Sequence, residues 1–279
     1  MFFHFLNIPP GFTGYEGGNV SMRIVVKVGT STLTHDTGKL NLRRMDHMAR
    51  VLADLRNQGI EVILVSSGAI GVGVGKLKLP AKPHDIGGRQ ACAAVGQCEL
   101  MYIYDKLFGE YGHVTAQVLL TRDCVDDDLR LRNIRNAFDR LLDMGALPII
   151  NENDTVATEE IEFGDNDTLS AVVAQIVRAD ALVILTDIDG LYTANPASDP
   201  NAELIHVVEE ITDHTRSIAG GAGTARGTGG MYTKIVAADR ATNAGITTAI
   251  INGSSPENLY SLLKGDEIGT VFPAKGGVR

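Results

Sequence analysis

Lys27 is the first residue whose type and position could do chemistry. It interrupts an apolar run, "RIVVKVG", and Gly29, Thr30 and Ser31 follow almost at once. A bare glycine backbone, two hydroxyls and an ammonium group are donors that together can neutralise a polyphosphate. The alternative is a strand lysine whose long stem only carries its ammonium group to the end of a sheet.

A second lysine, Lys234, follows an unusual loop. Between Gly221 and Gly230 the chain carries five glycines in ten residues, "GAGTARGTGG", and then turns into the helix-like run "MYTKIVAADRATNAG". Glycine costs conformational entropy, so such a loop indicates that the bare backbone is needed. Backbone N–H groups at the start of a helix attract anions, and Lys234 lies one turn into this one. The pattern predicts that both lysines bind one polyphosphate.

Lys76 belongs to a stretch that looks like a nucleotide-binding loop but does not match one. In "SSGAIGVGVGKL", Ile70 stands where a Walker A loop has its first glycine, and Leu77 replaces its hydroxyl residue. The glycine spacing does not give the dinucleotide fingerprint either. What remains is a strand that runs into Ser67 and Gly68. These residues either open a helix that faces an anion or form an ordinary serine N-cap.

Two clusters of amide and carboxylate side chains follow later in the chain. Three residues come directly after the apolar run "LPII": Asn151, Asn153 and Asp154. Three more open a helical segment in "GDNDTLSAVVAQIV": Asp165, Asn166 and Asp167. Capping a helix needs one such residue, so the density favours a site suited to hydrogen-bonding a zwitterion or placing a metal. Turn and cap chemistry is the alternative.

Thr186 and Asp187 end another apolar run, "ALVIL", and open the stretch "TDIDGLYTANP". This stretch has neither the ligand spacing of an EF-hand nor the pattern of a Rossmann turn, so by itself it reads as a loop. Its place at a strand end predicts that Thr186 and Asp187 lie where a nucleoside could bind.

These residues need a scaffold that brings strand ends together, and the hydrophobic pattern predicts one. Short β-branched runs alternate with amphipathic helical stretches, so we expect an α/β fold, a three-layer αβα sandwich with a mainly parallel central sheet. The expected strands are 23–29, 60–66, 113–120, 146–151, 181–186 and 246–251. The expected helices are 41–59 and about 86–110, 127–144, 168–178, 231–244 and 256–264. Ligands in such folds collect at the carboxyl ends of the strands.

The fold is expected to occupy residues 22–279 as one domain, because no repeat, linker or low-complexity tract interrupts it. Residues 1–21 begin with a few aromatic residues and continue with proline, glycine and polar residues. They lack the basic region and the long apolar segment of a signal peptide. We therefore expect a poorly ordered N-terminal extension there.

Composition excludes several classes of protein. The chain has 279 residues, 44% of them apolar, and a formal net charge of −9, so it can build a core but has no overall basic footprint. Cys92, Cys98 and Cys124 form no CxxC pair, which suits a reducing cytosol better than a disulfide framework. No apolar run approaches the roughly 20 residues that a membrane-spanning helix needs. We expect no nucleic-acid partner, no membrane segment and a cytoplasmic location.

A series of motifs runs through the chain in the order "VVKVGTS", "VSSGAIGVG", "ACAAVGQ", "LLTRDC", "PIINENDTVAT", "GDNDTLSA", "LTDIDGLYTANP" and "GTGGMYTK". With these motifs the chain, from about Met22 to Val271, resembles the glutamate 5-kinases of the amino acid kinase family. Aspartokinase, acetylglutamate kinase and uridylate kinase share the architecture. The combination of "NEND", "GDNDTLSA" and "GTGGM" is similar to the glutamate 5-kinase signature in particular.

The resemblance implies transfer of the γ-phosphoryl group of ATP to the side-chain carboxylate of L-glutamate, giving γ-glutamyl phosphate, the first step of proline biosynthesis. It implies three catalytic residues: Lys27 and Lys234, which contact the phosphates, and Asp167, which orients both lysines. The residues implied to hold glutamate are Ser67, Asp154 and Asn166. Those implied to bind ATP are Lys27, Gly29, Thr186, Asp187, Thr228, Gly229, Gly230, Met231, Tyr232, Thr233 and Lys234.

The implied reaction needs positive charge and no general base, because the attacking carboxylate is already ionised. Mg²⁺ is expected to enter with ATP, without a dedicated metal site in the protein. The resemblance further implies feedback inhibition by proline and a homo-oligomer. Many family members carry a C-terminal PUA domain, which is associated with RNA binding. This chain stops at Arg279 and is expected to lack it.

Two alternative functions remain at this point. One is a kinase of another small carboxylate or phosphate on the same fold. The other is a non-catalytic protein that senses a nucleotide or an amino acid. The presence of both Lys27 and Lys234 argues against the sensor.

Overall fold

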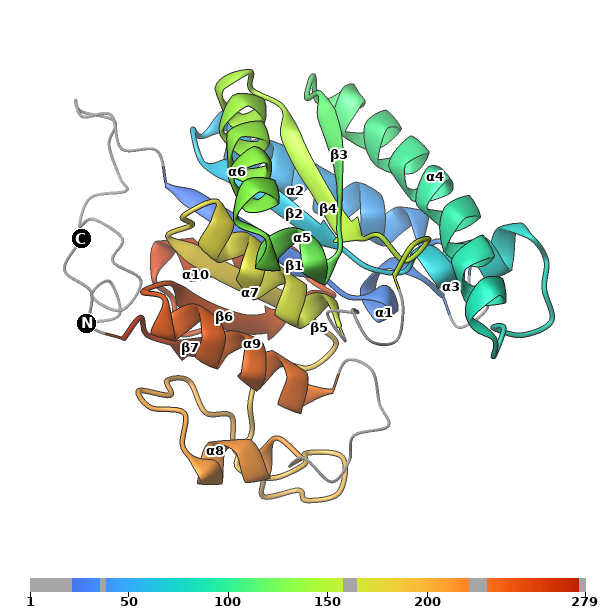
Figure 1. Cartoon of the computed structure of the whole chain (residues 1–279). Helices are drawn as coiled ribbons and strands as arrows, with labels where there is room; N and C mark the ends of the chain where they lie inside the picture. Colours follow the sequence, from blue (N-terminus) through green and yellow to red (C-terminus); the bar gives the residue numbers. More distant parts are fainter. Residues whose placement is uncertain (1–21, 36–38, 158–164, 221–229, 276–279) are drawn as a thin grey trace.

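The computed structural model describes residues 22–35, 39–157, 165–220 and 230–275, which form a seven-stranded sheet between two layers of helices (Figure 1). The strands are β1 (Arg23–Val28), β2 (Glu61–Ser66), β3 (Thr115–Leu120), β4 (Leu147–Glu152), β5 (Ala181–Thr186), β6 (Thr247–Asn252) and β7 (Thr270–Phe272). Their order across the sheet is β3-β4-β2-β1-β5-β6-β7. All paired strands are parallel except β6 and β7, so the predicted α/β sandwich with a mainly parallel sheet is confirmed. The predicted N-terminal extension, residues 1–21, lies outside the described residues.

Every helix predicted from the sequence is present. The helices are α1 (Thr30–Leu33), α2 (Leu42–Asn57), α3 (Ala69–Lys76), α4 (Ile86–Glu110), α5 (Arg122–Asp126), α6 (Asp128–Asp143), α7 (Asn166–Ile176), α8 (Asp213–Ile218), α9 (Met231–Asn243) and α10 (Asn258–Lys264). The sequence did not predict α1, α5, α8 or β7, and for α3 it indicated only that a helix could open at Ser67 and Gly68. Each of these elements is too short to display a clear hydrophobic period.

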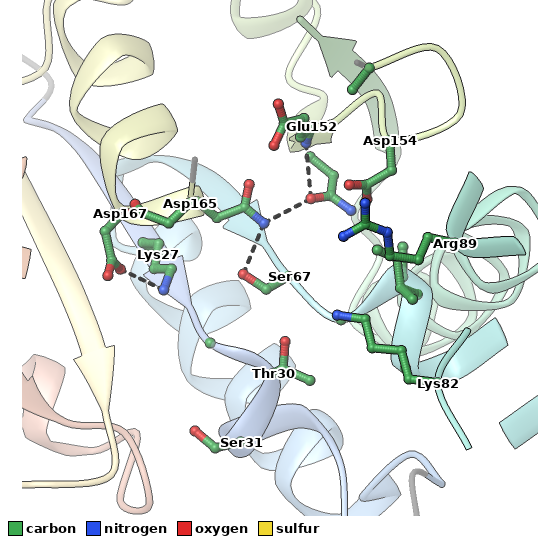
Figure 2. A pocket seen from close by; sticks show the side chains of 18 of the residues that line it. Lys27, Thr30, Ser31, Ser67, Lys82, Arg89, Glu152, Asp154, Asp165 and Asp167 are labelled. Atoms are coloured by element: carbon green, nitrogen blue, oxygen red, sulfur yellow. Dashed lines mark hydrogen bonds and ion pairs between the residues drawn. The ribbon is translucent and has the colours of Figure 1, made fainter. Parts of the chain in front are cut away.

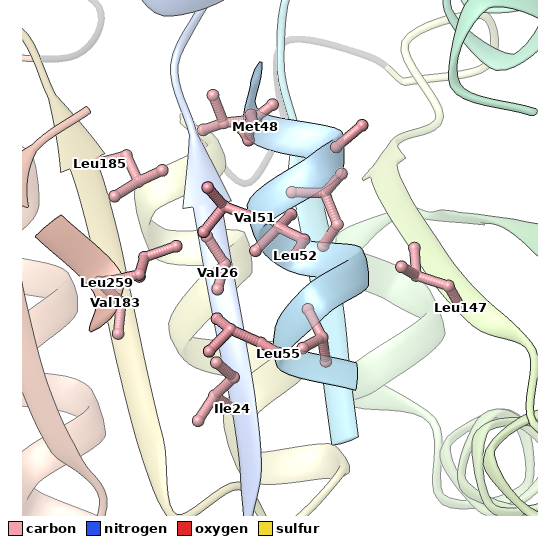
Figure 3. Close-up of a cluster of buried hydrophobic side chains, with 14 of the residues drawn as sticks. Ile24, Val26, Met48, Val51, Leu52, Leu55, Leu147, Val183, Leu185 and Leu259 are labelled. Carbon is pink, nitrogen blue, oxygen red and sulfur yellow. The ribbon is translucent and has the colours of Figure 1, made fainter. Parts of the chain in front are cut away.

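The pleat of β1 divides its side chains between two cores. Ile24, Val26 and Val28 pack into a first core with residues of α2, α4 and α10, part of which Figure 3 shows. Val25 packs into a second core on the other face of the sheet, with residues of α6, α7 and α9. Successive side chains of a strand point to opposite faces. Lys27 therefore points, like Val25, toward the layer of α7 and α9.

Helices α3 and α4 approach each other closely because glycines lie where they cross. A Cβ atom on Gly73 would lie 1.9 Å from the carbonyl oxygen of Cys92, and one on Gly96 would lie 1.8 Å from that of Ala69. No side chain fits at such distances, so the two backbones pack directly against each other. This packing fixes α4 beside the segment that follows β2. It also fixes the position of Gln97, the residue of α4 that follows Gly96.

Candidate active site

Four neighbouring strands, β4, β2, β1 and β5, end at one cavity of about 510 Å³ (Figure 2). Parallel strands place their carboxyl ends on the same edge of the sheet, so residues far apart in the sequence meet there. Nine of the residues that the resemblance assigns to the site line the cavity: Lys27, Gly29, Ser67, Asp154, Asn166, Asp167, Thr186, Asp187 and Lys234.

Lys27, Asp167 and Lys234 form an ion cluster in the wall of this cavity. Lys27 Nζ lies 2.5 Å from Asp167 Oδ1, and Lys234 Nζ lies 3.2 Å from Asp167 Oδ2. Thr233 Oγ1 donates a hydrogen bond to the same Oδ2 at 2.7 Å. None of the three charged side chains is more than 7% exposed. Two buried positive charges that share one carboxylate leave a net positive charge, which suits the binding of an anion.

The start of α7 explains why Asp167 faces the lysines. The side chain of Asp165 accepts a hydrogen bond from the backbone N–H of Thr168 at 2.7 Å and caps the helix. Asp167 lies inside the first turn and is fully buried. The helix already has its cap, so the alternative that Asp167 serves as the cap does not hold.

The two carboxylates differ in their electrostatic surroundings. Burial alone would raise the pKa of Asp167, but the charges of Lys27 and Lys234 outweigh burial and hold that pKa below its ordinary value. Burial raises the pKa of Asp165, and the neighbouring charge of Asp167 adds to it. Asp167 is therefore ionised at neutral pH, as an anchor for two ammonium groups must be.

Ser67, Asn151 and Asn166 form an amide cluster beside the ion cluster. Asn166 Nδ2 lies 2.9 Å from Ser67 Oγ and 2.9 Å from Asn151 Oδ1, and it donates to the carbonyl oxygen of Ser66 at 3.0 Å. Asn151 Nδ2 donates in turn to Gln97 Oε1 on α4 at 2.9 Å. These groups are neutral, so the Ser67 hydroxyl, whose oxygen faces Asn166 Nδ2, can donate to a carboxylate without adding charge.

Ser67 does not cap the helix that follows it. The N-cap of α3 is Gly68, which has a left-handed φ of 97°, and no side chain caps this helix. The interpretation of Ser67 as an ordinary serine cap is therefore wrong. Its hydroxyl lies against Asn166 instead.

Lys82 and Arg89 also line the cavity, and sequence reasoning missed both. Arg89 lies in the first turn of α4, and Lys82 lies in the segment before that helix. Figure 2 shows Arg89 beside Asp154, with Lys82 pointing toward the same part of the cavity. Neither residue follows a strand, so the strand-end rule gave no signal for them.

Four residues assigned to ATP from the resemblance lie just outside this lining. Gly230 is the N-cap of α9, and Met231, Tyr232 and Thr233 form the first turn of that helix. They are not among the described residues that line the cavity, although Lys234, the next residue, is. Thr228 and Gly229, with most of the glycine-rich loop, lie outside the described residues.

Thr186 and Asp187, also assigned to ATP, lie at the end of β5 and do line the cavity. Thr186 Oγ1 donates to Asp187 Oδ1 at 3.2 Å.

Lys76, the lysine of the apparent Walker A loop, lies at the last residue of α3. It forms an ion pair with Glu99 of α4, its side chain is 53% exposed, and it is not one of the lining residues described. The structure thus agrees with the exclusion of a Walker A loop.

Within the described residues, no group of three or more His, Cys, Asp or Glu side chains is placed to hold a metal ion. In the same part of the chain, no helix combines the length and the apolar character that crossing a membrane requires. The three cysteines are free thiols.

The fold and the buried lysines of its strand-end cavity define a class of kinase, and comparison with known proteins agrees. The model of the amino acid kinase family matches residues 22–252. The glutamate 5-kinase of Clostridium perfringens is 54% identical over 92% of this chain and 97% of its own length. The glutamate 5-kinase of Listeria monocytogenes serovar 1/2a is 52% identical over 91% of this chain and 94% of its own length. The chain belongs to the amino acid kinase family and, within it, to the glutamate 5-kinases.

Another relative and two solved structures extend the comparison. The glutamate 5-kinase of Caldanaerobacter subterraneus is 56% identical over 90% of this chain but only 68% of its own length. Isopentenyl phosphate kinase from T. acidophilum superposes with a TM-score of 0.62 at 19% identity, over 90% of this chain and 100% of its own. UMP kinase from Bacillus anthracis superposes with a TM-score of 0.62 at 16% identity, over 92% and 97%. At these identities the two structures show the fold alone.

Proposed function

We propose that this chain is an ATP-dependent kinase of L-glutamate. It transfers the γ-phosphoryl group of ATP to the side-chain carboxylate of glutamate, and the products are γ-glutamyl phosphate and ADP, the first step of proline biosynthesis. The observation that carries the proposal is the ion cluster at the strand-end cavity, in a chain 54% identical to a glutamate 5-kinase.

The ion cluster suits the chemistry of phosphoryl transfer. A bond forms between a carboxylate oxygen and the γ-phosphorus, and the bond from that phosphorus to the leaving ADP oxygen breaks. The obstacle is repulsion between a carboxylate and a polyanion, so positioning and positive charge supply most of the catalysis. Lys27 and Lys234 supply the charge, and Asp167 holds them aligned. No residue has to act as a general base, because a glutamate side chain is ionised at neutral pH.

Glutamate presents three charged groups, and the rest of the cavity offers partners for them. Asp154 is the carboxylate that would bind the α-ammonium group. Arg89 and Lys82, on the same side of the cavity, suit the α-carboxylate. Ser67, in the amide cluster, lies between these residues and the ion cluster in Figure 2, and its hydroxyl suits a carboxylate oxygen by a neutral hydrogen bond. Asn166, which also lines the cavity, lies against that hydroxyl with its Nδ2 at 2.9 Å.

ATP would extend from the ion cluster toward the end of β5. Thr186 and Asp187 line this side and would contact the nucleoside, while Gly29 and Lys234, which line the cavity as well, would contact the phosphates. The assignment of the segment 228–233 to ATP rests on the family resemblance. The described residues offer no carboxylate cluster for a metal, and Asp167 is already paired with lysines. We therefore assign Mg²⁺ to the ATP phosphates and water, where it offsets phosphate charge.

Three finer proposals rest on the family resemblance. Proline, which shares the amine and carboxylate of glutamate, would compete with it for the cavity, so the apparent KM for glutamate should rise with proline. An unchanged apparent KM would contradict a shared site.

We also propose a homo-oligomer, which sedimentation of the purified protein tests. The reaction draws on ATP and free glutamate, so we place it in the cytoplasm.

Trapping of the product tests the main proposal. Purified protein is incubated with glutamate, ATP, Mg²⁺ and hydroxylamine, which converts an acyl phosphate into a hydroxamate that iron(III) turns into a coloured complex. We expect hydroxamate with glutamate and little with aspartate, N-acetylglutamate or UMP, monitored in parallel by ADP release. ADP release with one of those other acceptors, and none with glutamate, would replace glutamate as the substrate. No turnover with any acceptor would favour the sensor.

A further inference from the structure

Gln97 lies behind the amide cluster, on α4, and is not one of the described residues that line the cavity. Its Oε1 accepts a hydrogen bond from Asn151 Nδ2 at 2.9 Å. Asn151 is only 2% exposed, so its side-chain amide has little access to water and depends on the protein for hydrogen bonds.

Two backbone groups fix the orientation of the asparagine amides. The backbone N–H of Glu152 donates to Asn151 Oδ1 at 2.9 Å, and a backbone N–H can only donate. Asn166 Nδ2 lies 3.0 Å from the carbonyl oxygen of Ser66, which can only accept. Asn151 therefore turns its oxygen toward Asn166 and its NH₂ group toward Gln97.

We infer that Gln97 is a positioning residue for glutamate, acting through Asn151 on Asn166. This inference rests on the proposed function. Without an acceptor at position 97, the buried NH₂ group of Asn151 loses a hydrogen bond. The simplest relief is a rotation that turns this NH₂ group toward the cavity, where water can solvate it. That rotation withdraws the Asn151 oxygen from Asn166 Nδ2, and the Asn166 amide loses one of the three acceptors that fix its orientation.

The packing of α4 holds Gln97 in place beside Asn151. Gly96 lies against the carbonyl oxygen of Ala69 so closely that the helix cannot shift toward or along α3 without a clash. Tyr104, two turns further along α4, forms a hydrogen bond with Ser66 Oγ at 2.9 Å. The same helix thus contacts both strands that flank Asn166, β2 at its last residue, Ser66, and β4 at Asn151, one residue before its end.

Substitution of Gln97 by methionine tests the inference, because methionine matches its length and removes the acceptor. We expect the KM for glutamate to rise about tenfold, the effect of losing one hydrogen bond to a charged ligand. The KM for ATP should change little. Gln97→Glu keeps an acceptor oxygen and should keep the KM for glutamate close to that of the unmodified protein. Gln175→Met is the matched control, since Gln175 is a half-buried helical glutamine that donates to the carbonyl oxygen of Arg240.

A double-variant cycle separates positioning from general stability. In an Asn166→Ala background, Gln97→Met should add no further loss, because the residue through which it acts is gone. An equal loss in both backgrounds, or equal changes in the KM values for glutamate and ATP, would overturn the inference. So would a Gln97→Glu variant as impaired as Gln97→Met. If Gln97→Met melts too low for assay, a rise of about tenfold in the KM for glutamate of Gln97→Glu would overturn the inference by itself. If the unmodified protein forms no acyl phosphate from glutamate, the proposed function itself is wrong. If it does and Gln97→Met behaves like it, only the role of Gln97 is wrong.

Discussion

The ion cluster and the amide cluster face the same cavity but are held together in different ways. Lys27, Asp167 and Lys234 are held by charge, with one carboxylate between two ammonium groups. Asn151 and Asn166 are neutral and are held by backbone hydrogen bonds. The backbone N–H of Glu152 donates to Asn151, and the carbonyl oxygen of Ser66 accepts from Asn166. The ion cluster suits the transfer of a charged phosphoryl group, and the amide cluster suits the recognition of a small substrate.

This difference has a consequence for substitutions. The ion cluster carries two positive charges and one negative charge. Loss of one lysine leaves a neutral pair, whereas loss of the carboxylate leaves two buried positive charges side by side. The members of the ion cluster should therefore differ in their effect on stability, although all of them matter for turnover. In the amide cluster no charge is left over, and a substitution should change binding more than stability.

The largest effect is expected from the lysines. Lys234→Ala or Lys27→Ala should lower kcat by roughly 100-fold or more, because each removes a charge that, in the proposed mechanism, stabilises the transferring phosphoryl group. The melting temperature should stay close to that of the unmodified protein, because the other lysine and Asp167 remain as a pair. Steady-state kinetics and a melting curve on each variant measure both quantities.

Lys76→Ala is the control for these lysines, because Lys76 lies at the surface in an ion pair with Glu99. Its turnover should be unchanged. A loss at Lys76 comparable to that at Lys234 would mean that the phosphates bind elsewhere, and normal turnover of Lys27→Ala or Lys234→Ala would contradict the proposed mechanism.

Asp167→Asn should lower both turnover and stability. Two ammonium groups without their shared carboxylate would separate, so we expect kcat to fall at least about tenfold. The protein should lose about 3 kcal/mol of stability, as when one partner of a buried ion pair is removed. Added phosphate should raise the melting temperature of the variant more than that of the unmodified protein, because an anion replaces the missing charge.

The pH dependence of this loss follows from the lowered pKa of Asp167. A carboxyl whose pKa is lowered by folding contributes stability above its unfolded pKa and loses it as the pH falls through its folded pKa. The difference in melting temperature between the unmodified protein and Asp167→Asn should therefore be full at pH 7 and shrink below about pH 4. A difference that does not change with pH would show that packing, not charge, is lost.

Gly29→Ala should reduce activity without harm to the fold. Gly29 has an extended backbone, with φ −83° and ψ 162°, which alanine adopts readily. The added Cβ would lie 3.8 Å from Lys27 Nζ and 3.9 Å from Ser31 Oγ, both ordinary contacts. It would also fill cavity space beside the ammonium group, where the proposed mechanism places a phosphate oxygen. We expect kcat/KM for ATP to fall about tenfold or more. An unchanged kcat/KM would place the phosphates away from Gly29.

Most of the fold could be predicted because the long elements repeat their signal. The four central strands, β4, β2, β1 and β5, are mostly apolar, as strands buried on both faces must be, and α4 was predicted at its observed bounds of 86–110. The edge of the sheet was harder to predict from the sequence. β7 has only three residues and pairs antiparallel with β6, so neither its length nor the alternation of strands and helices revealed it.

The candidate site could be predicted where a residue stands out from its surroundings. Lys27 interrupts an apolar strand, and polar residues crowd the start of α7 beyond what one cap needs. Gln97 and Arg89 do not stand out in this way, since both are ordinary residues for a helix. The motif "ACAAVGQ" contains Gln97, but its contact with Asn151 depends on how α4 packs on α3 at Gly96, which the local sequence does not encode.

The smallest effect is expected from Asp165→Asn. Asp165 lies two residues from Asp167, but this substitution should raise the melting temperature, whereas Asp167→Asn should lower it. Asparagine caps a helix as well as aspartate does, so Asp165→Asn keeps the hydrogen bond to Thr168. Burial, together with the charge of Asp167, raises the pKa of Asp165, so its ionised form is disfavoured in the folded protein. Removal of that charge should raise the melting temperature at pH 7 by about 1–3 °C.

The sign of the pH dependence gives the test for Asp165→Asn. A carboxyl whose pKa is raised by folding contributes stability below its unfolded pKa and loses it as the pH rises through its folded pKa. Melting temperatures of the variant and the unmodified protein should therefore coincide near pH 3 and separate toward pH 7, with the variant higher. The N-terminus of α7 opposes this trend, because it favours a negative charge at the cap. A variant that melts lower at pH 7 would show that the helix end outweighs burial and the repulsion from Asp167.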